Sequence, residues 1–125
     1  MDQRTSFRNI INLFFLRKNH LIELLFDEKA TIADRDDAAM ELANFDDDQT
    51  LNALLVLGRN KNEDELILNS CGESLGSIWV NRNFFDKQAY ESLSGTSRYG
   101  AFYVISSRKS EWISKYNLFN DKFLD

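Results

Sequence analysis

The chain has 125 residues, of which 43% are apolar and 28% charged, and its formal net charge is −5. This composition is typical of one soluble domain with one core, and an aromatic content of 13% excludes collagenous and disordered classes. The single cysteine, Cys71, can form neither an internal disulfide nor a four-cysteine zinc site, so we expect a reducing compartment.

The N-terminal segment is not predicted to be a signal peptide. Arg4 and Arg8 precede a short apolar stretch, residues 10–16, which is interrupted by Asn12 and followed by no small-residue cleavage site. No window approaches the roughly 20 apolar residues that a transmembrane helix needs. We therefore expect a cytoplasmic protein with no membrane partner.

The apolar residues follow a helical period from the start of the chain. Phe7, Ile10, Ile11 and Phe14 have the spacing i, i+3, i+4, i+7, which is typical of one helix face. Polar residues at 18–20 predict a break, after which a second apolar stripe begins. Further helices are predicted over residues 34–45, 51–58, 64–79, 86–93, 96–107 and 111–119.

Residue types at the boundaries support these helices. Asp48 or Thr50 is the expected N-cap of the helix that stops near Gly58, and acidic residues 63–65 complement the positive end of the next helix dipole. Residues 101–105 would also suit a buried strand, but an isolated strand has no partner, which favours a helix. The expected fold is all-α, with seven or eight short antiparallel helices in a single domain over residues 1–125.

Two of the predicted helices are similar in sequence. Residues 38–45 align with residues 71–78 at an offset of 33 residues, so that small residues coincide and Leu42 falls on Leu75. A fixed period of this length is typical of helical solenoids, in which each hairpin buries its apolar face against its neighbours. A weaker copy, at a shorter offset, lies at residues 100–105.

This pattern of small residues around a leucine resembles the HEAT-like repeat family over about residues 34–107. The resemblance implies short antiparallel helical hairpins stacked as a small α-solenoid. An irregular helical bundle is the alternative that the helix pattern leaves open.

Residues 72–76, Gly-Glu-Ser-Leu-Gly, match the nucleophile elbow of serine hydrolases. That elbow needs a strand before it and a histidine after the serine, whereas His20, the only histidine, precedes Ser74. The two glycines are better explained as points where two helices approach closely. Cys71 lies on the inward stripe of its helix and His20 is expected at an exposed turn or helix start, so we expect no catalytic residues and no enzyme.

The acidic residues also suggest a metal site, because hard cations prefer oxygen ligands. Counted from Asp34 as an EF-hand loop, however, the sixth position is Ala39 and the twelfth is Phe45, where that loop needs Gly and Glu. We therefore expect no metal and no cofactor.

Charge is distributed unevenly along the chain. Residues 1–20 carry four basic and one acidic side chain, residues 21–65 four basic and thirteen acidic, and residues 66–125 seven basic and six acidic. The acids of the middle segment gather in three clusters: Asp34, Asp36 and Asp37; Asp46, Asp47 and Asp48; Glu63, Asp64 and Glu65.

These clusters have two interpretations. Acids near helix N-termini cap the helix and complement its dipole, by about 0.3–1 kcal/mol each. Alternatively, connections of stacked hairpins align the three clusters along one edge, which would attract a basic protein and repel nucleic acid. Under this second interpretation all nine acids are partner-binding residues.

Aromatic residues form a second candidate contact surface. They gather around the end of one predicted helix and on the last one, and core packing would bury most of them, leaving one or two as interface anchors. The residues are Trp79, Phe84, Phe85, Trp112, Tyr116 and Phe119.

A small acidic protein with helical repeats and no catalytic groups is similar to the immunity proteins of bacterial polymorphic and contact-dependent toxin systems. This resemblance implies a protein that binds a cognate toxin domain and blocks its active site or substrate cleft. If the toxin is a nuclease, its cleft is basic, and the acidic clusters would take the place of phosphates. The alternative is a generic helical-repeat adaptor or scaffold that binds another cytosolic protein.

Overall fold

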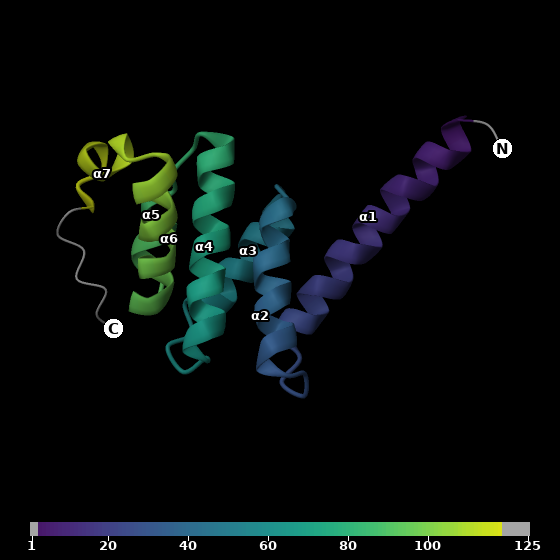
Figure 1. Cartoon of the computed structure of the whole chain (residues 1–125), viewed down its shortest axis with the longest axis horizontal. Helices are drawn as coiled ribbons and strands as arrows, with labels where there is room; N and C mark the ends of the chain where they lie inside the picture. The colour runs from purple at the N-terminus through teal and green to yellow at the C-terminus, as the bar shows by residue number, and fades with distance from the viewer. Residues whose placement is uncertain (1–2, 119–125) are drawn as a thin grey trace.

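The computed structural model describes residues 3–118, with side chains described from Ser6 onward. Within these residues all regular structure is helical, as predicted (Figure 1). The elements are α1 (Gln3–Phe26), α2 (Ile32–Glu41), the 3-10 helix η1 (Leu42–Asn44), α3 (Asp48–Gly58), α4 (Glu65–Arg82), α5 (Lys87–Ser92), α6 (Gly95–Arg108) and α7 (Glu111–Lys115).

Helices α2, α4 and α6 lie side by side and run in the same direction (Figure 1). The Ser74 hydroxyl of α4 donates to the carbonyl oxygen of Ala39 in α2, 2.6 Å away. Arg82 at the end of α4 pairs with Asp46, in the connection between η1 and α3. The Arg108 guanidinium of α6 donates to the side-chain oxygen of Asn81 in α4, at the C-terminal ends of both helices. Helix α3 packs on α4, and α1 packs on α2 at one end of the row.

The helix starts follow from their capping residues. Asp64 and Asp86 accept hydrogen bonds from backbone N–H groups of the first turns of α4 and α5, as Thr31 and Ser94 do for α2 and α6. Both predicted caps of α3, Asp48 and Thr50, were wrong, because the carboxylate of Asp47 accepts from the Thr50 N–H at 2.8 Å and Asp48 is the first residue of the helix. Thr50 itself lies in the first turn of the helix.

The predicted break at residues 18–20 is also wrong, because α1 continues through them. Lys, Asn and His have only moderate helix-propensity penalties, and tertiary contacts outweigh them here. The buried Lys18 ammonium donates to the carboxylate of Asp47 at 3.0 Å and lies 5.0 Å from the centre of the Phe15 ring. His20 is exposed, as expected, but lies within the helix.

Other boundaries differ by short segments. The helix predicted over 34–45 ends at Glu41 and tightens into η1, and the last helix spans only Glu111–Lys115. Residue 119, its predicted end, lies outside the described residues. Residues 101–105 are helical, within α6.

Close contact between α4 and α6 depends on glycine. A Cβ atom at Gly72 would lie well under 3.0 Å from the carbonyl oxygen of Ser97, and one at Gly100 would also lie under 3.0 Å from that of Asn69. A Cβ atom at Gly76 would lie 3.0 Å from the carbonyl oxygen of Ala101 in α6. The expectation that Gly72 and Gly76 mark a close helix approach is therefore confirmed. The core formed around this contact includes Leu42, Leu75, Ile78 and Ile105.

Candidate protein-binding site

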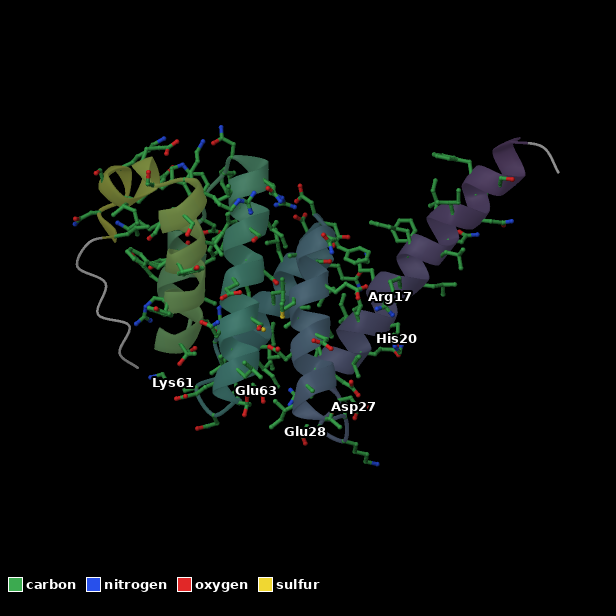
Figure 2. All side chains as sticks on the ribbon, viewed as in Figure 1. Arg17, His20, Asp27, Glu28, Lys61 and Glu63 are labelled. Carbon is green, nitrogen blue, oxygen red and sulfur yellow. The ribbon has the colours of Figure 1, made fainter. Side chains whose placement is uncertain are left out.

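Two of the three acidic clusters lie at the same end of the molecule. Asp34, Asp36 and Asp37 lie within α2, Glu63 and Asp64 directly precede α4, and Glu65 is the first residue of α4. Arg35 of α2 connects these two clusters, because its guanidinium donates to both carboxylate oxygens of Glu63, at 2.7 and 3.2 Å. Figure 2 shows Glu63 at this end together with Lys61 and with Asp27 and Glu28 of the α1–α2 connection.

The third cluster lies at the other end of α4. Asp46 and Asp48 both pair with Arg82, the last residue of that helix, whereas residues 63–65 are at its start. Since α4 has 18 residues, its two ends are roughly 27 Å apart. The structure therefore does not align the three clusters along one edge, as the stacked-hairpin argument expected.

Several of the nine acids already have internal partners. Asp64 and Asp47 cap α4 and α3, Asp47 also accepts from Lys18, and Asp36 accepts from the Ser70 hydroxyl at 2.5 Å. Burial raises the pKa of Asp47, but hydrogen bonds from Thr50 and Lys18 outweigh it and the pKa is lowered. Capping and pairing thus explain a large part of the acidic pattern.

Glu63 is the most strongly engaged of the nine. Arg35, itself buried, also donates from Nε to the carbonyl oxygen of Leu25 at 3.0 Å, so it ties α1, α2 and the start of α4 together. Hydrogen bonds from Arg35 lower the pKa of Glu63 despite its partial burial, and the same pairing raises the pKa of Arg35. This ion pair stabilises the fold, and because Arg35 neutralises the Glu63 carboxylate, Glu63 adds little to the attraction of a basic partner.

Three of the predicted residues remain available. Asp34, Asp37 and Glu65 are exposed, and no ion pair within residues 3–118 engages their carboxylates. Asp27 and Glu28, also exposed, add to the same end of the molecule, and sequence reasoning missed them because it followed runs of three acids (Figure 2). We call these five residues, Asp27, Glu28, Asp34, Asp37 and Glu65, the acidic end.

The hydrolase-like motif is part of the helix packing. Residues 72–76 lie inside α4, and the buried Ser74 hydroxyl is occupied by its hydrogen bond to Ala39. Cys71 is fully buried, as predicted, and burial raises its pKa to about 12. A thiol with such a pKa is not a nucleophile near neutral pH.

The aromatic residues divide between core and surface. Phe85 is the centre of a buried cluster, with ring centroids 4.8–5.5 Å from those of its neighbours Trp79, Tyr90, Trp112 and Tyr116. Phe84, beside the left-handed Asn83, is 63% exposed and is the one candidate anchor of this group among the described residues. Phe119 lies outside them.

Sequence reasoning missed the largest exposed apolar surface. The spacing that begins at Phe7 correctly predicts a helix, but it does not show that the first half of α1 extends beyond the other helices and leaves this stripe exposed (Figure 1). The signal available in the sequence was the presence of Leu13 and Leu16 on the other sides of that helix.

Within residues 3–118, no helix combines the length and apolar character needed to cross a membrane. In the same part of the chain, no three His, Cys, Asp or Glu side chains are grouped so that they could hold a metal ion. Comparison with known proteins found no match to a protein-family model, to a curated protein or to a solved structure.

Proposed function

We propose that this chain is a binding protein of the immunity type, which docks on a basic toxin domain and blocks its active site or substrate cleft. The observation that carries the proposal is the acidic end, where five exposed carboxylates gather from the α1–α2 connection, α2 and the start of α4. Asp34 and Glu65 lie in the first turns of α2 and α4, where they complement the helix dipoles, but no ion pair or capping hydrogen bond among the described residues engages these two carboxylates or that of Asp37. Like charges held together at low salt are costly, and a basic partner relieves that cost.

The proposal includes a finer description of the fold, a small HEAT-like α-solenoid built from hairpins. Its support is that α2, α4 and α6 run in parallel, and that contacts between α2 and α4 join residues at nearly equivalent positions of the two repeats. Ser70 of α4 contacts Asp36, which is 34 positions earlier in the sequence, and Ser74 contacts Ala39, which is 35 positions earlier. Both separations are close to the offset of 33 residues between the repeated segments. Such a stack presents helix ends in rows, which suits a surface that binds another protein. We place this activity in the bacterial cytoplasm.

The test begins with identification of the partner. The tagged chain is used to recover proteins from cells of its own source at low salt, and any recovered toxin-like domain is purified and assayed with and without it. Nanomolar binding that abolishes the toxic activity is the expected result. Recovery of a resident complex that exchanges readily, with no inhibition of any activity, would instead favour the adaptor alternative.

Charge variants then test the surface. Asp34→Asn, Asp37→Asn and Glu65→Gln together should lower the association rate at low salt by about tenfold or more, since electrostatic steering depends on local charge. The matched control removes three exposed carboxylates away from the acidic end, with Asp48→Asn, Glu91→Gln and Glu111→Gln. Equal effects of the two triple variants would reject the acidic end as the interface.

A further inference from the structure

The first half of α1 is an apolar helix that the rest of the chain does not cover. The face that buries Leu21 and Leu25 continues toward the N-terminus through Phe14 and Phe7, at helical spacing, past the point where α2 ends (Figure 1). Phe14 still contacts Phe45, with ring centroids 4.6 Å apart. We call residues 6–17 the α1 arm.

The exposed area on the α1 arm is large enough for a stable interface. Seven large apolar side chains leave roughly 700 Å² uncovered, compared with about 800 Å² per partner in a standard protein–protein interface. It also exceeds the largest apolar patch of a typical monomer, about 300–600 Å². The seven residues are Phe7, Ile10, Ile11, Leu13, Phe14, Phe15 and Leu16.

The distribution of these residues favours a protein partner over a lipid surface. At about 100° per residue, Leu16 lies opposite Phe7 on the helix, and both are 64% exposed. A helix that lies on a bilayer has one apolar and one polar face, and the α1 arm lacks this division.

Charge identifies a second copy of this chain as the matching partner. Residues 3–22 contain four basic and no acidic side chains, and two of the four, Arg17 and Lys18, already pair with Glu41 and Asp47 of the same copy. This leaves Arg8 of the α1 arm to pair with an acidic residue of another molecule, and residues 23–65 of a second copy contain thirteen acidic side chains. We propose that two copies associate through their α1 arms, each arm lying antiparallel beside α1 of the other copy. One partner then supplies both the apolar helix and the acidic surface that a basic apolar arm requires.

The antiparallel arrangement also gives the third acidic cluster a role. In a pair centred on Ile11, Arg8 of one copy lies opposite Phe14 of the other, and Phe14 contacts Phe45, which directly precedes residues 46–48. The Asp48 side chain is fully exposed and makes only a long ion pair of 3.6 Å to Arg82. Arg8 is thereby brought toward the carboxylate of Asp48.

Sedimentation velocity of the full chain over a wide concentration range tests the proposal. We expect a monomer–dimer equilibrium with a dissociation constant near micromolar or tighter. Phe7→Glu and Ile10→Glu should each weaken the dimer by at least about a hundredfold, because each change acts twice in a two-fold dimer. The matched control is Phe84→Glu, which alters a phenylalanine with 63% exposure on the α4–α5 connection and should leave the dimer intact.

Charge reversal tests the orientation. Arg8→Glu should weaken the dimer, and addition of Asp48→Lys in the same chain should restore part of the lost affinity. Circular dichroism of each variant establishes that it is folded, which is expected because all these side chains are exposed.

A monomer at all concentrations, an unchanged dimer in the arm variants, or no recovery in the double charge variant would each overturn the proposal. So would a monomer that sediments with phosphatidylcholine–phosphatidylserine vesicles through its α1 arm. Because the α1 arm and the acidic end are separate surfaces, this result and the outcome of the toxin-binding test are independent.

Discussion

The contact between α4 and α6 predicts a large effect of a single methyl group at Gly72. The Cβ atom of Gly72→Ala would meet the carbonyl oxygen, carbonyl carbon and Cα of Ser97, all backbone atoms in the first turn of α6. None of these can move alone, so the two helices must separate by about 1 Å or more, and α4 makes its most extensive contact with α6.

The magnitude follows from two opposing effects. Replacing glycine by alanine inside a helix stabilises it by about 1 kcal/mol, whereas overpacking of this kind costs about 1–3 kcal/mol and more when backbone must shift. Because backbone must shift, the cost lies at the upper end of this range, and we expect a net loss of about 2 kcal/mol for Gly72→Ala, which corresponds to roughly 6–10 °C in Tm for a chain of this size.

Urea and thermal unfolding, followed by far-ultraviolet circular dichroism, measure this loss. Gly58→Ala is the matched control, because its added Cβ would meet the tip of the Leu93 side chain at 3.0 Å, which can rotate away. Gly76→Ala, with a Cβ 3.0 Å from the carbonyl oxygen of Ala101, should fall between the two. If Gly72→Ala were as stable as the unmodified chain, the close α4–α6 packing would be wrong.

Further predictions concern the Arg35–Glu63 ion pair and Cys71. Arg35→Met should cost about 3 kcal/mol in urea unfolding, because it leaves a partly buried carboxylate unpaired, and adding Glu63→Leu should recover most of the loss; no recovery would argue against the pair. Arg35 lowers the pKa of Glu63 from its ordinary 4.5 in the folded state, so the stabilisation is present at neutral pH and is lost as pH falls from about 4.5 through the folded-state pKa. Urea midpoints measured over this range should fall less steeply in Glu63→Gln. Alkylation of Cys71 at neutral pH should follow global unfolding, since burial raises its pKa to about 12; rapid modification of the folded chain would contradict the buried position.

Local chemistry in the sequence was enough to predict most of the secondary structure. The apolar period gave the helices, Asp86 and the acids at 63–65 marked the starts of α5 and α4, and two glycines four residues apart indicated a close helix contact. These features depend on neighbours within one or two turns, which a sequence pattern contains. The buried state of Cys71 follows from the same period.

The candidate surfaces were decided by packing between distant residues. Arg35 and Glu63 are 28 positions apart and Arg82 and Asp46 are 36 apart, so no local pattern shows which acids are neutralised and which stay free. An apolar stripe likewise has the same period whether or not another helix covers it. The sequence alone determined that Phe7 lies on an apolar helix face, and only the tertiary structure, in which α1 is longer than the helices beside it, left that face uncovered.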